Sequence, residues 1–202
     1  MSTARTSARQ LGVALRAVAV LTLALGLVYP LVVTGLGQAV AGNRANGSPV
    51  TVDGTTVGSE LIGQSFTDEN GAALPQWFQS RPSAAGDGYD GGASGGSNLG
   101  PTNPDLAAAI RERRTAVAEL EGVDPDDVPA DALTASSSGL DPHISPEYAL
   151  LQADRVAAER GLGTGEVRAL VEAAVEGRQA GVLGQGRVNV LKLNIALSEL
   201  DT

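Results

Sequence analysis

The sequence contains no cysteine, one histidine and one lysine, and each scarcity excludes a class of site. Without cysteine, the chain can form neither a disulfide framework nor a thiolate metal site. The single histidine, His143, excludes a histidine cluster, so we expect no metal site. The only lysine, Lys192, does not follow a glycine-rich loop, which excludes a P-loop for nucleotide phosphates.

Aromatic residues and positive charge are also scarce. Aromatics make up 3% of the 202 residues, which is few for a sugar-binding or base-stacking surface. The formal net charge is −9, so the chain as a whole repels a phosphate backbone. Nucleic acid is therefore not an expected partner.

A long uncharged run near the N-terminus is the feature around which the chain is organised. Residues 17–43 contain 27 positions without a charge. About 20 residues are enough for a helix to cross the hydrocarbon core of a bilayer. We therefore predict a transmembrane helix at residues 11–40, a cytoplasmic N-terminus at residues 1–10 and an extracytoplasmic domain at residues 41–202.

The charges beside this run predict its direction. Residues 1–16 carry Arg5, Arg9 and Arg16 and no acidic residue, so the rest of the chain has a net charge of −12. Short basic flanks remain in the cytoplasm. We expect a single-pass protein of the cell membrane whose N-terminus is cytoplasmic and whose C-terminal domain is extracytoplasmic.

The same run has an alternative interpretation as a cleaved secretion signal. Ala39, Val40 and Ala41 form the small-x-small pattern of a cleavage site. In that case the chain would be a secreted periplasmic binding protein or hydrolase, released by cleavage after Ala41. Retention is favoured because the run exceeds the usual signal core of about 7–15 residues and has Tyr29-Pro30 inside it.

The residues after the membrane helix predict one α+β domain with several helices and a small β-sheet. About 160 residues are enough for one hydrophobic core. Asp53-Gly54 lies between two β-branched runs and predicts a hairpin over residues 50–57. The expected core anchors after this hairpin are Leu61, Ile62 and Phe66.

Capping residues, glycine stops and apolar periodicity predict four helices in this domain. The predicted ranges are 104–121, capped by Asn103 and ended by Gly122; 146–160, capped by Ser145 and ended by Gly161; 165–176, capped by Thr164; and 188–200, capped by Asn189. The last range also alternates as a strand would, and the cap favours the helix.

No catalytic set is recognisable in the sequence. Ser137, Asp141 and His143 lie near one another, but nothing marks the buried acid and oriented base that a triad needs. We interpret residues 141–143 as a turn whose carboxylate and imidazole bind the local backbone. The residues expected to form structural or partner-contacting turns are Arg81, Ser83, Asp141 and His143.

A long polar loop is the sharper candidate for function. Residues 83–104 consist mainly of Gly, Ser, Asn, Asp and Pro, and a loop of this length is either disordered or functional. Its glycines, amides and hydroxyls suit an anion or a dehydrated cation, whereas the alternative is a turned loop that only caps the next helix. The candidate residues are Ser94, Gly95, Gly96, Ser97, Asn98, Gly100, Thr102 and Asn103.

Six stretches, spread over the whole chain, carry a more specific signal. They are GLVYPLVVTGLGQ at 26–38, GSELIGQSF at 58–66, FQSRPSAA at 78–85, SGGSNLGPTNPDL at 94–106, TASSSGLDPHISPEYALLQADRVAAERGL at 134–162 and VLGQGRVNVLKLNIAL at 182–197. In this order they resemble the C subunit of the Kdp-type potassium-transporting P-type ATPase. The departures from the family pattern are Ser137 in place of glycine, Gln185 in place of glutamate and a short insertion at 72–76.

The resemblance implies an accessory, non-enzymatic subunit that stabilises and regulates a high-affinity, ATP-driven potassium import complex. Its partners would be the channel-like and ATP-hydrolysing membrane subunits. It also implies a catalytic chaperone that raises the ATP affinity of the catalytic subunit, so the loop at 94–103 is expected to contact a partner or to be related to the nucleotide. No cofactor is expected to be bound covalently, and ATP is expected at the level of the complex.

Overall fold

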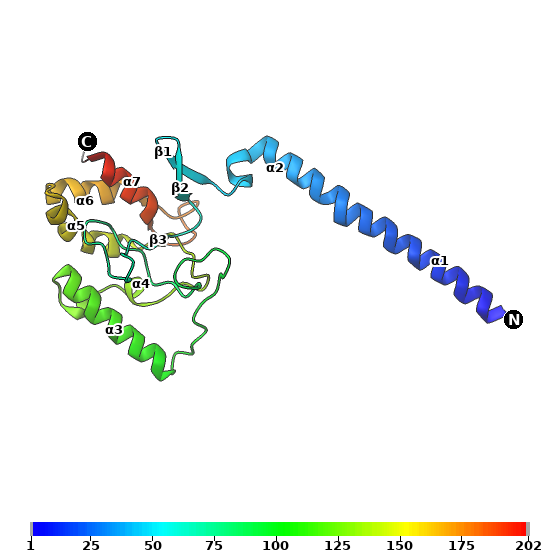
Figure 1. Cartoon of the computed structure of the whole chain (residues 1–202), viewed down its shortest axis with the longest axis horizontal. Helices are drawn as coiled ribbons and strands as arrows, with labels where there is room; N and C mark the ends of the chain where they lie inside the picture. Colours follow the sequence, from blue (N-terminus) through cyan, green and yellow to red (C-terminus); the bar gives the residue numbers. More distant parts are fainter. Residues whose placement is uncertain (1, 201–202) are drawn as a thin grey trace. The chain divides into compact units, whose positions relative to one another are not determined.

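The computed structural model describes residues 2–200, with side chains from residue 7 onward (Figure 1). The chain divides between Ser48 and Pro49 into two compact units. The first unit is a helical segment, and the second is a domain of helices and small sheets.

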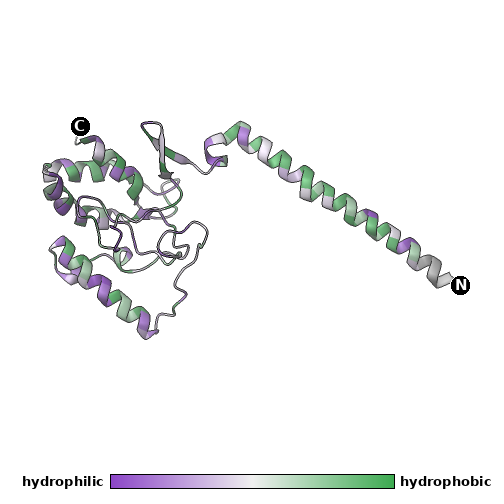
Figure 2. Cartoon of the chain, in the orientation of Figure 1, coloured by the Kyte–Doolittle hydropathy of each residue, from purple (hydrophilic) through white to green (hydrophobic). Residues whose placement is uncertain are grey.

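The first unit is one long apolar helix. It consists of α1 (Ser2–Leu23), the π turn η1 (Ala24–Val28) and α2 (Tyr29–Ala45). Among the described residues, Ser7–Ala45 is the one span long and apolar enough to cross a membrane, and its most apolar part is not buried against any protein (Figure 2). The transmembrane helix predicted at residues 11–40 lies within this span.

The π turn lies directly before Pro30. Proline has no N–H, and its ring clashes with the carbonyl four residues earlier, which is that of Gly26. The preceding Tyr29 N–H binds the Ala24 carbonyl, five residues back, so the wider turn carries the helix past the proline. A second irregularity is at Ala41, where φ is −146° and ψ is 49°.

The second unit is the predicted mixture of helices and small sheets. It begins with an antiparallel hairpin of β1 (Pro49–Val52) and β2 (Thr55–Ser59). Asp53 and Gly54 at the turn have φ of 49° and 78°. Two consecutive positive φ angles are what a tight two-residue hairpin loop requires, which confirms the predicted hairpin.

The two helices with the clearest end signals have the predicted bounds. They are α3 (Pro104–Glu121) and α5 (Pro146–Arg160). Asn103 and Ser145 each accept a hydrogen bond from a backbone N–H of the first turn, at 2.7 and 3.0 Å. The glycine after each helix has a left-handed φ of 67°, so both the caps and the stops are confirmed.

The next predicted helix, at residues 165–176, is partly wrong. The structure has α6 (Thr164–Ala173), and Thr164 is its first residue rather than its cap. Val175 and Glu176 form β4, which pairs antiparallel with β5 (Arg187–Asn189). The helix therefore stops early because a strand from later in the chain pairs with its expected last turn.

The C-terminal segment is a helix, as the cap favours. It forms α7 (Val190–Leu200), and the Asn189 side chain accepts from the Lys192 N–H at 3.1 Å. The strand alternative holds only for β5, the central strand of a three-stranded sheet of order β3-β5-β4, in which β3 is His143–Ile144. Two short elements lie between α3 and β3, namely η2 (Pro125–Asp127) and α4 (Ala130–Leu133).

The core of the domain lies among α5, α6, α7 and the three-stranded sheet. Its fully buried side chains include Val156, Val167, Val171, Val188, Leu193 and Leu197.

Of the three expected anchors after the hairpin, Phe66 packs against this core, but Leu61 and Ile62 do not. Their side chains are 59% and 38% exposed. A β-bridge between Ser59 and Ile62, and a 3.1 Å hydrogen bond from the Leu61 N–H to the Ser59 hydroxyl, close a tight turn. Leu61 therefore lies at an exposed corner.

Side-chain amides hold an irregular segment, residues 75–79, inside the core. Asn194 on α7 accepts from the Phe78 N–H at 2.9 Å and donates to the Phe78 carbonyl at 3.0 Å. Gln152 on α5 accepts from the Gln79 N–H at 2.6 Å and donates to the Gln79 carbonyl at 3.2 Å. Each side-chain amide pairs with one backbone N–H and one C=O, as a neighbouring β-strand would, so these buried backbone groups have hydrogen-bond partners.

A buried ion pair extends this arrangement. Arg155 on α5 donates from Nε to Glu121 Oε2 at 2.9 Å, from Nη1 to the Pro75 and Trp77 carbonyls, and from Nη2 to Gln152 Oε1 at 3.0 Å. The Glu121 side chain is fully buried, and burial raises its pKa against the opposing effect of Arg155. Glu121 Oε1 has no partner among the described residues. The carboxylate therefore depends on Arg155.

We expect Arg155→Leu to lower the free energy of unfolding by about 3–5 kcal/mol, because the Glu121 charge would remain buried without its partner. The matched control is Arg168→Leu, which removes an ion pair with Asp154 whose side chains are 44% and 60% exposed. The control should cost at most about 1 kcal/mol. Urea unfolding of the full chain in detergent, followed by fluorescence of the single tryptophan, Trp77, measures both. Similar losses for the two variants would contradict this account of the buried pair.

Candidate functional site

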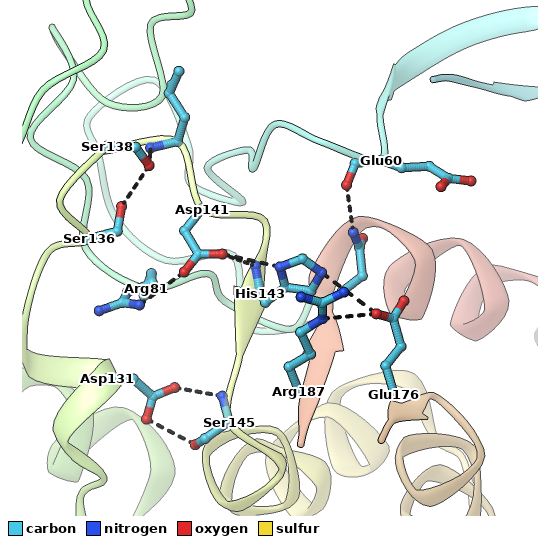
Figure 3. A network of polar contacts seen from close by, with 12 residues as sticks. Glu60, Arg81, Asp131, Ser136, Ser138, Asp141, His143, Ser145, Glu176 and Arg187 are labelled. Carbon is cyan, nitrogen blue, oxygen red and sulfur yellow. Dashed lines mark hydrogen bonds and ion pairs between the residues drawn. The ribbon is translucent and has the colours of Figure 1, made fainter. Parts of the chain in front are cut away.

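A row of two arginines, two carboxylates and a histidine joins separate parts of the domain (Figure 3). Arg81 Nη1 donates to Asp141 Oδ2 at 3.0 Å. Asp141 Oδ1 accepts from the His143 backbone N–H and lies equally close, at 3.1 Å, to Nδ1 of its ring. The other ring nitrogen, Nε2, lies 3.9 Å from Glu176 Oε2, which accepts from Arg187 Nε at 3.0 Å. We call these five residues the charged row.

The register of the small sheet positions the charged row. In β3, His143 is paired with Asn189 of β5. In β4, Glu176 is paired with Arg187 of β5, which brings this ion pair beside the histidine ring. The sequence-based interpretation of the turn at Asp141 identified local bonding but missed Glu176 and Arg187, because their approach depends on strand pairing.

The charged row keeps the Asp141 carboxyl ionised. Burial raises its pKa, but the hydrogen bonds from His143 and the charge of Arg81 outweigh this effect, and the net pKa lies below its usual value. Ionised Asp141 therefore contributes to the stability of the fold at neutral pH.

Ser83, the fourth predicted turn residue, is not part of the charged row. It belongs to a group of hydrogen bonds that also includes Tyr89 and the Arg81 backbone. Its hydroxyl donates to the Gly139 carbonyl at 2.6 Å and accepts from the Tyr89 N–H at 2.9 Å. The Tyr89 hydroxyl donates to the Arg81 carbonyl at 2.8 Å, and burial raises the pKa of Tyr89 to about 12, which keeps this donor protonated. These contacts hold the backbone that carries Arg81.

The first part of the predicted contact loop packs on the turn at residues 136–138, which we call the serine-rich turn. The Ser94 hydroxyl and the Gly95 N–H both donate to the Ser138 carbonyl, at 3.0 and 2.8 Å. A Cβ atom on Gly96 would lie 3.0 Å from the Ser137 carbonyl oxygen, closer than side chains ordinarily approach. These three loop residues therefore serve contacts within the domain.

The second part of the loop has a different environment. Ser97, Asn98, Gly100 and Thr102 are exposed, and the side chains of Ser97, Asn98 and Thr102 have no hydrogen-bond partner within residues 7–200. Asn103 caps α3. The capping role therefore applies to Asn103 alone, and the three exposed polar side chains make no described hydrogen bond, although Asn98 has a left-handed φ of 54° that asparagine tolerates.

Two surface cavities share Arg81, Asp141 and His143 as lining residues. One, of about 530 Å³, is bounded by the loop at 177–186. The other, of about 610 Å³, is bounded by the serine-rich turn and by the exposed pair Leu61 and Ile62, among others. Three residues of the charged row therefore line both cavities, and Arg187 lines the first as well.

Within the described residues, the side-chain contacts of His143 are with carboxylates. The His143 ring contacts the carboxylates of Asp141 and Glu176, and no described serine hydroxyl binds it. The Ser137 side chain makes no described hydrogen bond to the row, although Ser137 lines the second cavity with Arg81, Asp141 and His143. Within the described part of the chain, no three His, Asp or Glu side chains are grouped as metal ligands. The geometry is that of a network of ion pairs and hydrogen bonds at the surface of the domain.

Charge is strongly divided between the two units. All 23 acidic residues and 10 of the 14 basic residues lie in residues 49–202, which therefore carry a net charge of −13. Residues 1–48 carry four arginines and no acid. The domain is acidic, and the apolar helix has basic flanks.

Known proteins resemble this chain over nearly its whole length. A family model described as "K+-transporting ATPase, c chain" (KdpC) matches residues 11–199. A potassium-transporting ATPase KdpC subunit of Kineococcus radiotolerans is 57% identical over 189 residues, covering 94% of this chain and 93% of that protein. Proteins of the same name from Nitratidesulfovibrio vulgaris (54% identical, 85% of each chain) and Mycobacterium tuberculosis (49% identical, 95% of this chain and 99% of that protein) are also similar. The match includes the apolar helix and the domain alike.

The charged row predicts a specific pH dependence of stability. Because the folded pKa of Asp141 is below its usual value of 3.8, its stabilising contribution is complete above the unfolded pKa and is lost as pH falls through the folded pKa. We expect Asp141→Asn to be less stable than the wild type by a constant amount above about pH 5, and the difference to shrink below about pH 4. Urea unfolding of the full chain across pH measures it. A difference that stays constant down to about pH 2.5 would contradict the depressed pKa.

Proposed function

Because the chain belongs to the KdpC family, we propose that it is an accessory, non-catalytic subunit of an ATP-driven potassium import complex in the cell membrane. The observation that carries this proposal is the family match, which extends over both the apolar helix and the domain. The proposed partners are the channel-like and ATP-hydrolysing membrane subunits of the pump. Its proposed roles are to stabilise and regulate their assembly.

The apolar helix supports an anchored subunit rather than a released binding protein or hydrolase. The span Ser7–Ala45 has no covering protein in the chain itself, so lipid or other helices must cover it. Small residues at Gly26, Thr34 and Gly35 allow close packing of neighbouring helices, and a Cβ atom on Gly35 would meet nothing within 4 Å. We propose that this helix remains in the mature protein and packs against the membrane partners.

The arginines before the uncharged run at residues 17–43, three against the single Arg44 after it, support the proposed direction of insertion. The arginines at the N-terminal end of the helix favour the cytoplasmic side, and the domain of charge −13 lies on the other side. In this topology the domain is separated from a cytoplasmic nucleotide site. We therefore propose that a catalytic-chaperone effect on ATP affinity acts through subunit contacts, with ATP bound elsewhere in the complex.

The orientation can be tested with a reporter that is active only outside the cytoplasm. We expect activity when alkaline phosphatase is fused to the C-terminus and none when it is fused to the N-terminus, because the basic flank stays inside. The matched control is a variant in which Arg9 and Arg16 are changed to Glu, which should reduce the C-terminal signal.

Activity of the N-terminal fusion alone would contradict the proposed topology. N-terminal sequencing of the membrane-extracted chain tests the alternative that the helix is a cleaved secretion signal. A mature N-terminus at Gly42 would show that the helix is removed rather than retained.

The exposed part of the contact loop is the proposed assembly contact. We expect the double variant Asn98→Gly, Thr102→Ala to keep its melting temperature, because neither side chain has a described partner and glycine accepts the left-handed φ of 54° at residue 98. Co-purification with the pump subunits and potassium-stimulated ATP hydrolysis should both decrease.

The matched control for this test is Asn103→Ala. It removes the cap of α3, costs about 1 kcal/mol of stability and should leave assembly intact. Equal losses of stability and assembly in the double variant would show that the loop is only structural.

A further inference from the structure

The loop between β4 and β5 presents two apolar side chains to solvent. Backbone hydrogen bonds in both directions between Gln179 and Leu183, each of 2.9 Å, close it into a hairpin. Val182 and Leu183 at its tip are 73% and 63% exposed. Among the described residues of the domain they are the most exposed large apolar side chains. The hairpin buries neither side chain, so a binding partner would have to cover them.

The hairpin also forms one wall of the cavity of about 530 Å³. Gln179, Leu183 and Gln185 line it from the hairpin side. Arg81, Asp131, Asp141, His143 and Arg187 line it from the body of the domain. An external segment that covers the apolar tip can therefore place a side chain in a charged cavity directly behind it.

The charge of the domain favours a cation at this cavity. Three carboxylates, those of Asp131, Asp141 and Glu176, lie at or beside the cavity, against the two guanidinium groups of Arg81 and Arg187. The hairpin itself carries Arg178, so these three carboxylates and three guanidinium groups balance, whereas the domain as a whole carries −13. Arg81 and Arg187 already have carboxylate partners at 3.0 Å. An additional anion would therefore meet net repulsion, and an additional Lys or Arg side chain would meet net attraction.

The same charges discriminate among possible occupants. An anionic lipid surface is repelled by a domain of this charge, and so is a second copy of it. A protein segment that combines a basic residue with an apolar pocket suits both the cavity and the tip. Under the proposed function, the proteins held beside this domain are the integral membrane subunits of the pump.

We propose that the hairpin at residues 177–186 and the cavity behind it form a docking site for a basic extracytoplasmic loop of a membrane partner. Val182 and Leu183 enter an apolar pocket of the partner, and a Lys or Arg of the partner enters the cavity beside Asp141. This inference rests on the proposed function, and it assigns a surface separate from the loop at residues 94–103.

The test uses the full chain in mild detergent and, as the probe, pump subunits purified without this chain. We expect the double variant Val182→Ser, Leu183→Ser to bind at least about tenfold more weakly, as truncation of anchor residues usually does. The matched control is Val52→Ser, Val57→Ser, which changes two exposed valines of the β1–β2 hairpin and should alter the Kd less than about twofold. The tip variant should keep the wild-type melting temperature because its side chains are 73% and 63% exposed, whereas the control, whose strand valines are 36% and 37% exposed, should melt at a lower temperature and still bind.

A second arm tests the electrostatic part. Wild-type affinity should decrease as choline chloride rises from about 50 to about 500 mM, because screening weakens charge attraction. Glu176→Gln should reduce this salt dependence, whereas the Val182→Ser, Leu183→Ser variant should keep it. A salt dependence that is unchanged in Glu176→Gln would overturn the basic-partner assignment.

The remaining outcomes separate this inference from the proposed function. Wild-type affinity in the serine variant at the tip would overturn the hairpin site and leave the subunit proposal intact. Failure of the wild-type chain to bind the pump subunits would overturn the proposed function itself. Tip-dependent binding to vesicles of anionic lipid, or tip-dependent self-association of the chain, would assign the hairpin to a different occupant and overturn the inference.

Discussion

The domain depends on satisfying the backbone of an irregular segment that passes through its core. Residues 75–79 belong to no helix or strand, yet Phe78 is fully buried. The amides of Asn194 and Gln152 bind this backbone from two different helices, and Arg155 binds it from the same helix as Gln152. Without these side chains, buried N–H and C=O groups would have no partner, which is costly in an apolar interior.

This support also determines where the candidate site lies. Arg81 follows the held segment by two residues, so its position is set by the core, while its guanidinium reaches Asp141 at the surface. On the other side, pairing of β4 with β5 fixes Glu176 and Arg187 beside His143. The charged row therefore connects the core-bound segment at 75–79 with the paired strands β4 and β5. A partner that binds there would contact side chains that are already oriented, which reduces the entropy lost on binding.

The division of the chain into an apolar helix and an acidic domain agrees with membership in a family of membrane transport subunits. The helix requires lipid or other helices around it, and the domain presents charged cavities edged by exposed apolar side chains. Exposed leucines and valines at turns, such as Leu61 and Leu183, do not contribute to the core. In a protein held beside partners by a membrane anchor, such residues are suited to contacts between subunits.

The sequence by itself determined the features that depend on neighbouring residues. The apolar run, the Asp53-Gly54 hairpin, the bounds of α3 and α5 and the Asn103 cap follow from local rules of length, φ preference and capping, and the structure has them. Family membership was also recognisable, because it resides in ordered motifs.

Only the tertiary structure decided the features that depend on contacts between distant residues. Strand pairing converted the expected end of α6 into β4, and a turn at Ser59 exposed Leu61, which apolar character alone would bury. Pairing likewise brought Glu176 and Arg187 to His143. Local patterns cannot specify which strand will pair with a segment or which apolar side chain remains uncovered, because both depend on long-range packing.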